Sequence, residues 1–251
     1  GADFDTQVVV KTNVAEVLSR ELRRPSWTRE TVALGTNTDP YQRAEGRYRL
    51  MPGILNALAE SGTPYSILTK GTLVRRDLPL IAAAEQDGPG ASVSISLAVV
   101  DPELQRDLEP GTPAPQARLA LISAIRDAGL DCHVMVAPVL PGLTDSPEHL
   151  EALLRAIADA GATSATVFGL HLRGATRDWF MAWLQRAHPE LVFRYRSLYR
   201  RGAYLPPEYR DKLRARVAPL LTRYRLTGRG PMARAGAVSS EVTAPAHPTL
   251  F

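Results

Sequence analysis

A short polar segment combines hydroxyl, amide and carboxylate groups within seven residues. It follows an apolar run and consists of Thr36, Asn37, Thr38, Asp39, Pro40, Tyr41 and Gln42. Pro40 disfavours helical backbone at the preceding residue, so we expect a loop that projects before the next helix begins. Such a mixture of groups could hold an ammonium group or a ribose. The structural alternative is a helix N-cap, which needs only Thr38 or Asp39.

Two further apolar runs carry polar side chains at or near their ends. Lys70 follows Ile67-Leu68-Thr69 and could pair with a carboxylate or phosphate, or form a Schiff base if desolvation lowers its pKa. The alternative for Lys70 is a plain surface lysine. In Ser92–Leu97 the serines alternate with apolar residues, so Ser94 and Ser96 share one face. That face is either the interior of a barrel or the solvent side of an edge strand.

The second half of the chain adds a carboxylate, a proline and two cationic side chains at similar places. Glu109 lies in Leu108-Glu109-Pro110-Gly111-Thr112, and Ala137-Pro138 ends a β-branched run. Pro138 is expected to end the strand pairing and to leave backbone groups for a ligand such as an adenine. His171 and Arg173 could contact an anionic substrate, although a lone histidine has many structural roles.

These side chains require strands whose ends meet at one edge. Short apolar runs recur at Gln7–Lys11, Thr31–Gly35, Tyr65–Thr69, Ser92–Leu97, Cys132–Pro138 and Ser164–Leu170. Helical periodicity lies between them, as in Ala44–Glu60, and Gly62, Gly129 and Gly161 are expected to end helices in the left-handed conformation. This alternation predicts βαβ units and a parallel sheet. Barrels and open sheets both place active sites at the carboxyl ends of strands, so closure stays open.

Composition excludes several classes of protein. The chain has 251 residues, 45% of them hydrophobic, which excludes general disorder. No run of apolar residues is long enough to span a membrane, and the N-terminus does not resemble a signal peptide. The single cysteine, Cys132, excludes a disulfide framework and is expected to be a small core residue in a reducing, cytoplasmic setting. Because no initiator Met is present, we expect a piece of something longer.

Positive charge is concentrated near the C-terminus. The net charge is +4, yet most of the cations from Arg186 to Arg234 have no acidic counterpart, and tyrosines lie among them. This pattern suits phosphate contact and base stacking, so we expect DNA contact through Arg194–Arg225. A solvated basic helical face is the alternative. The segment from Gly228 on is expected to be a flexible tail whose Leu250 and Phe251 could bind a sliding clamp.

An ordered set of segments resembles the radical S-adenosylmethionine (radical SAM) proteins related to spore photoproduct lyase. The resemblance extends from about Asp3 to Leu226. Its segments are Val8-Val9-Val10-Lys11-Thr12-Asn13, Leu34–Gln42, Ile67-Leu68-Thr69-Lys70, Ser94-Ile95-Ser96, Glu109-Pro110-Gly111-Thr112 and Val134–Pro138. The resemblance implies an α/β fold, a partial (β/α)6 TIM-like barrel without its first strand and cluster loop. The expected division is 1–188 for the barrel, 189–227 for a basic helical extension and 228–251 for the tail.

The resemblance also implies a 5′-deoxyadenosyl radical made from S-adenosylmethionine by a [4Fe–4S] cluster. By similarity, Thr38 and Asp39 lie by the methionine end, Lys70 with Ser94 or Ser96 near the carboxylate and ribose, and Ala137 near the adenine. The full set of expected cofactor-binding residues is Thr36, Asn37, Thr38, Asp39, Lys70, Ser94, Ser96, Glu109, Ala137 and Pro138. Expected substrate contacts are Tyr41, Gln42, His171 and Arg173.

Two departures from the family pattern matter. The Cys-x-x-x-Cys-x-x-Cys loop that holds the cluster is absent, so we expect no metal ligand in this chain and no activity from this chain alone. Thr36 stands where the lyases carry a cysteine hydrogen donor, which puts repair of spore photoproduct itself in doubt. Two other functions stay open: a Schiff-base lyase that uses Lys70, and a non-catalytic nucleic-acid-binding module.

Overall fold

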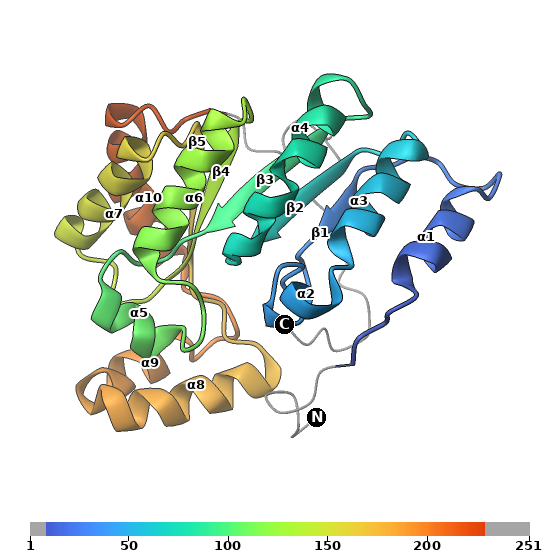
Figure 1. Ribbon diagram of the computed structural model, residues 1–251. Coiled ribbons are helices and arrows are strands. Elements are labelled where there is room, and N and C mark those ends of the chain that lie inside the picture. Colours follow the sequence, from blue (N-terminus) through green and yellow to red (C-terminus); the bar gives the residue numbers. More distant parts are fainter. Residues whose placement is uncertain (1–8, 229–251) are drawn as a thin grey trace. The chain divides into compact units, whose positions relative to one another are not determined.

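Helices and parallel strands alternate along residues 9–228, the part of the chain that the computed structural model describes (Figure 1). The strands are β1 (Val32–Leu34), β2 (Tyr65–Thr69), β3 (Ala91–Ser96), β4 (Cys132–Val139) and β5 (Ser164–Gly169). The helices are α1 (Val14–Leu22), α2 (Arg43–Tyr48), α3 (Met51–Glu60), α4 (Leu78–Gln86), α5 (Pro102–Leu108), α6 (Pro115–Asp127), α7 (Pro147–Asp159), α8 (Gly174–Ala187), α9 (Val192–Leu198) and α10 (Pro207–Arg223), with 3-10 turns at Thr72–Asp77 and Pro189–Leu191. Five of the six predicted strands are thereby confirmed.

The predicted strand at Gln7–Lys11 is wrong for the residues that can be judged. Residues 7 and 8 lie outside the described part, and Val9 to Lys11 form no strand. Val9 is 88% exposed and Val10 is half-buried, so the described residues cover this short apolar run only in part. The polar residues Thr12 and Asn13 then lead directly into α1, which begins at Val14.

The described residues form two compact units. The first comprises residues 9–95 and 120–132, and the second comprises residues 96–119 and 133–228. In the first unit β1, β2 and β3 pair in parallel, with Val32 opposite Tyr65 and Tyr65 opposite Ala91. Helices α3 and α4 lie over one face of these strands (Figure 1). Burial increases from β1, which has no buried residue, to β3, which is buried at all but one position.

The helix predicted over Ala44–Glu60 is broken into α2 and α3. Arg49, at the end of α2, has φ 50°, a left-handed conformation that ends the helix. The buried carboxylate of Glu45 then accepts hydrogen bonds from the amides of Leu50 and Met51 at 2.9 and 3.1 Å. These amides would lack partners at the start of α3, and Pro52 in its first turn donates no bond, so Glu45 supports a new helix start.

In the second unit β4 and β5 pair in parallel, and the register shifts between Val136 and Val139. The Ala137–Pro138 peptide bond is cis. The prediction that Pro138 ends the pairing is wrong, because pairing resumes at Val139 and the amide of Leu170 donates to the Val139 carbonyl at 3.0 Å. Pro138 instead interrupts the ladder, since it has no N–H to donate.

The predicted glycine ends of three helices are confirmed. Gly62, Gly129 and Gly161 have φ of 69°, 77° and 93°, so each helix end uses the left-handed conformation that a Cβ disfavours. Helix α7 buries one apolar face, which consists of Leu150, Leu153, Leu154 and Ile157. The described residues contain no helix long and apolar enough to cross a membrane. The predicted boundaries at 188 and 227 stay predictions, and Leu250 and Phe251 lie outside the described residues.

Candidate functional site

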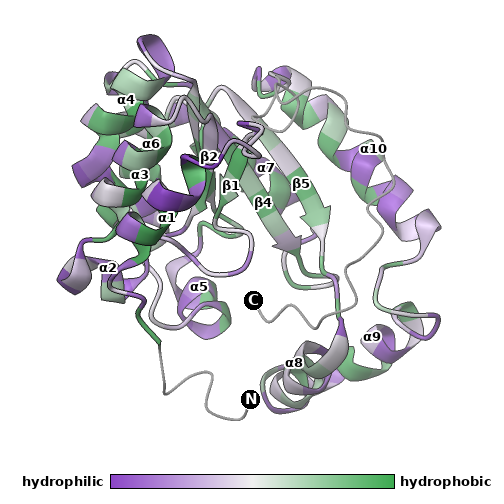
Figure 2. Cartoon of the chain, turned by 90° about the vertical axis from the view of Figure 1, so that its right-hand side faces the viewer, coloured by the Kyte–Doolittle hydropathy of each residue, from purple (hydrophilic) through white to green (hydrophobic). Residues whose placement is uncertain are grey.

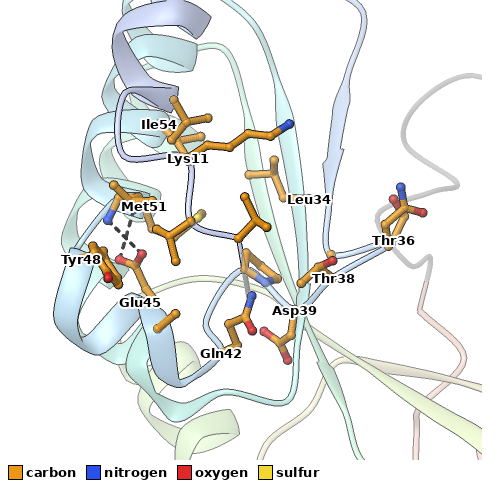
Figure 3. Close-up of a pocket in the computed structure, with 18 of the residues that line it drawn as sticks. Lys11, Leu34, Thr36, Thr38, Asp39, Gln42, Glu45, Tyr48, Met51 and Ile54 are labelled. Carbon is orange, nitrogen blue, oxygen red and sulfur yellow. Dashed lines mark hydrogen bonds between the residues drawn. The ribbon is translucent and has the colours of Figure 1, made fainter. Parts of the chain in front are cut away.

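A cavity of about 440 Å³ lies in the first unit, beside the polar loop that follows β1 (Figure 3). Lys11, the loop residues Thr36 to Asp39, and Gln42 line it together with apolar side chains of α3. Figure 3 shows Thr36 set apart from Gln42, Asp39 and Glu45. Because Thr36, Asn37 and Thr38 are exposed, their polar groups are accessible to a ligand.

Asp39 ties this loop to the end of β2. Its carboxylate accepts hydrogen bonds from the Thr69 hydroxyl at 2.5 Å, the Lys70 amide at 2.7 Å and the Tyr41 amide at 2.9 Å. Gln42, rather than Thr38 or Asp39, is the N-cap of α2, and no side chain caps that helix. The N-cap alternative is therefore wrong. Asp39 fixes the position of the loop that lines the cavity.

Two glycines permit the close approach of these segments. Gly35 has φ 104°, and a Cβ there would collide with the Leu68 carbonyl oxygen. A Cβ at Gly71 would collide with the backbone oxygen of Tyr41. The loop after β1 and the segment after β2 are therefore in backbone contact, which only glycine allows.

A buried polar network holds the end of the loop that follows β1. The Tyr41 hydroxyl donates to Asp77 at 3.1 Å, and Tyr41 is only 2% exposed. Arg76 donates to both oxygens of Asp77 and pairs with Glu45 at 2.6 Å. Burial, followed by the Asp77 carboxylate, raises the pKa of Tyr41 far above its ordinary value. The structure thus places Tyr41, an expected substrate contact, in the core, whereas Gln42 lines the cavity.

The other strand ends of the first unit are polar and largely buried. Lys70 follows β2 and is half-buried. Ser94 lies on β3 and is 4% exposed, and its apolar neighbours on the strand are also buried. Ser96, the last residue of β3, belongs to the second unit and is 7% exposed. The solvent-facing alternative for these two serines is therefore wrong, since both faces of the strand are covered.

In the second unit Glu109 is bound to a fully buried arginine. The Arg118 guanidinium donates to Glu109 at 2.6 Å, to the Ser96 carbonyl at 3.0 Å and to the Pro113 carbonyl at 2.9 Å. It also donates to the Thr112 hydroxyl. The Leu97 amide donates to Met135 at 3.0 Å, so the end of β3 lies beside β4 within this unit. Ala137 and Pro138, both half-buried, lie further along β4.

His171 and Arg173 follow β5 and both contact Tyr204. The His171 and Tyr204 rings meet edge to face at 4.7 Å, and the Arg173 guanidinium lies 4.8 Å from the Tyr204 ring centre. Burial, followed by the charges of Arg173 and Arg210, lowers the pKa of His171. This environment therefore favours the neutral form of His171.

Most aromatic side chains of the basic segment, residues 186–234, pack or form hydrogen bonds within the protein. Tyr195 and Tyr199 are buried, and the hydroxyls of Tyr209 and Tyr224 donate to Asp145 and Glu151. Of the described aromatic side chains in this segment, only those of Phe193 and Tyr204 are exposed. Most of the arginines in this segment are exposed, so phosphate contact stays a prediction. Base stacking has less support, because most of the aromatic rings are not exposed.

The described residues do not fit an iron–sulfur cluster. No group of three His, Cys, Asp or Glu side chains between residues 9 and 228 is close enough to hold a metal ion. Cys132, the one cysteine of the sequence, is fully buried, and burial raises its pKa to about 12. A cluster needs several thiolate ligands, which this chain does not supply.

Parallel strands with polar loops at their carboxyl ends define an α/β fold in which ligands bind at those ends. The profile of the Radical SAM superfamily matches residues 6–157. The chain belongs to the radical SAM superfamily.

Sequence relatives extend beyond this chain. It is 78% identical over 228 residues to the Mycobacterium tuberculosis protein Rv2578c, a match that covers 91% of this chain and 67% of the relative. It is 29% identical over 163 residues to protein ORF301 of Acidianus two-tailed virus, covering 63% of this chain and 52% of that protein.

Solved structures of spore photoproduct lyase share the fold, which is a partial radical SAM barrel. The lyase complexed with dinucleoside spore photoproduct matches with a TM-score of 0.57 at 16% identity over 86% of this chain. A mutant lyase with bound AdoMet and dinucleoside spore photoproduct matches with a TM-score of 0.58 at 15% identity over the same share. This chain spans 65% of the length of either lyase chain, less than two thirds.

Proposed function

We propose that this chain forms the S-adenosylmethionine-binding part of a radical SAM enzyme related to spore photoproduct lyase. The cavity beside the β1 loop is the observation that carries the proposal, because it combines Lys11 with exposed hydroxyl and amide groups on a fixed backbone. S-adenosylmethionine carries an ammonium, a carboxylate and ribose hydroxyls, which match that mixture. The cofactor is the source of a 5′-deoxyadenosyl radical in this superfamily.

The structure supports different roles for the expected cofactor-binding residues. Thr36, Asn37 and Thr38 present polar groups that can contact the cofactor directly. Asp39 accepts three hydrogen bonds from the chain itself, which supports a positioning role for that residue. In the first unit we propose Lys70 and Ser94 as additional contacts. Cofactor contact by Ser96, Ala137 and Pro138, residues of the second unit, stays a prediction, while Glu109 holds its own loop through Arg118.

We also propose that this polypeptide needs cysteine ligands from outside its own sequence to hold the [4Fe–4S] cluster. The single, buried Cys132 supports this, since its thiol is neither accessible nor ionised near neutral pH. The chain alone is then inactive in radical chemistry. Nucleic acid is the proposed substrate class, supported by the exposed arginines between Arg194 and Arg225.

Binding of S-adenosylmethionine to this chain, measured by equilibrium dialysis, tests the proposal. Thr38→Val removes a polar group from the cavity and is expected to weaken binding about three- to tenfold, the range for one hydrogen bond. Thr31→Val is the matched control, because Thr31 is an exposed threonine that directly precedes β1 and does not line the cavity. Absence of binding, or equal losses in both variants, would contradict the proposed site.

A further inference from the structure

A second cavity, of about 460 Å³, lies in the second unit between β5 and α10. Figure 2 shows α10 alongside β5, and the lining residues come from β5, from the segment around Tyr204 and from one side of α10. Its volume is within the range of sites that take small organic ligands. None of the residues proposed to bind S-adenosylmethionine lines it.

Part of the lining of this cavity is cationic. His171, Arg210 and Arg214 line it, and the Arg173 guanidinium lies over the ring of Tyr204, another lining residue. Arg214 pairs with Asp211 at 2.8 Å, but no carboxylate among the described residues lies within ion-pair distance of Arg173 or Arg210. Two guanidinium groups on neighbouring segments, with no ion-paired carboxylate among residues 9–228, therefore raise the potential of the cavity, which favours an anionic ligand.

The rest of the cavity is apolar and has aromatic rings at its rim. Leu213, Val217 and Leu221 of α10 line one side. Phe168 and Tyr204 line the cavity while each remains 46% exposed, which is unusual for large aromatic side chains. A flat ring can stack on such side chains and at the same time cover them from water.

We propose that the cavity between β5 and α10 binds a small ligand in which a phosphate or carboxylate is attached to a planar ring. Arg210 and His171 bind the anionic group, and Phe168 contacts the ring. Arg173, stacked on Tyr204, adds positive charge without entering the cavity. This site is separate from the cofactor cavity beside β1, so the proposal goes beyond the proposed function and does not depend on it.

Titration of this chain with phenyl phosphate, benzoate, inorganic phosphate and phenol tests the proposal, with the five histidine side chains followed by NMR. His171→Gln assigns the His171 signal. Bound anion favours imidazolium, so phenyl phosphate or benzoate is expected to raise the pKa of His171. Whichever of phenyl phosphate and benzoate binds more tightly identifies the anionic group that the cavity prefers. Phenol is expected to leave the His171 pKa unchanged, and inorganic phosphate to bind more weakly than phenyl phosphate.

Two variants separate this site from general positive charge. Arg210→Gln is expected to weaken phenyl phosphate binding about tenfold or more, as a charge-assisted hydrogen bond is lost. Arg196→Gln is the matched control, an exposed arginine of α9 outside the cavity, and is expected to leave binding unchanged. Phe168→Leu is expected to weaken phenyl phosphate binding while the affinity for inorganic phosphate stays the same.

Three results would overturn the proposal. The first is no change at His171 at millimolar phenyl phosphate. The second is an equal loss of affinity in Arg210→Gln and Arg196→Gln. The third is displacement of phenyl phosphate by a short single-stranded oligonucleotide at much lower concentration, which would assign the cavity to nucleic acid rather than to a small ligand.

Discussion

Replacement of Arg118 by methionine is expected to destabilise the protein by about 3–5 kcal/mol, the usual cost of removing one partner from a buried ion pair. Arg118 is fully buried, and its guanidinium donates to Glu109, to the Thr112 hydroxyl and to two backbone carbonyls. Methionine fills similar volume but removes the guanidinium that pairs with the Glu109 carboxylate at 2.6 Å. Urea unfolding followed by circular dichroism measures the change in the free energy of unfolding.

Arg126→Met is the matched control for this change. Arg126 pairs with Asp131 at 2.9 Å, but both side chains are substantially exposed. An exposed pair of this kind contributes roughly 0–1 kcal/mol. If the two variants lost the same stability, Arg118 would not be the support of the 109–113 loop that its contacts indicate.

Asp39→Asn is expected to destabilise the protein by about 2–4 kcal/mol and to weaken S-adenosylmethionine binding as the β1 loop loosens. The carboxylate accepts bonds from the Thr69 hydroxyl and from the Lys70 and Tyr41 amides. Hydrogen bonds to a charged group contribute about 1.5–3 kcal/mol each, less than additively, and an amide nitrogen in place of one oxygen cannot accept them. Urea unfolding and equilibrium dialysis measure the two effects.

Asp87→Asn serves as the control, because Asp87 is an exposed aspartate at the end of α4 in the same unit. Its replacement is expected to change stability by less than about 0.5 kcal/mol. A stable Asp39→Asn variant with unchanged cofactor binding would remove the positioning role of Asp39.

The positions of the strands could be predicted because each strand coincides with a short run of apolar, β-branched residues. The five confirmed strands all begin and end within one residue of their predicted bounds. The glycine signals at Gly62, Gly129 and Gly161 were equally local. The break at Arg49 was missed because Ala44–Glu60 keeps an apolar period throughout, and only Pro52 signals a new helix start.

Polar partners far apart in the sequence could not be predicted. Asp39 binds residues 30 and 31 positions away, and Arg76 reaches Glu45 across 31 positions. No local pattern distinguishes a carboxylate that accepts bonds from the chain from one that contacts a ligand. For the same reason Arg118, one of thirty cations, gave no sign that it would be fully buried.

In the basic segment, composition suggested base-stacking aromatic rings that the fold instead buries. Arginines among tyrosines are typical of nucleic-acid contact, yet Tyr195 and Tyr199 pack in an apolar cluster with Phe180 and Leu184. The 3.6-residue period that puts the arginines outside puts these rings inside. Phosphate contact by the exposed arginines stays a proposal.

Reductive cleavage of S-adenosylmethionine tests the central claim most directly. This chain and the longer relative Rv2578c would each be treated anaerobically with iron and sulfide, reduced, and assayed for 5′-deoxyadenosine and methionine. We expect cofactor binding by both proteins and cleavage by the longer relative alone, because one buried cysteine cannot hold the cluster. Cleavage by this chain at a similar rate, or cofactor binding by neither protein, would contradict the account.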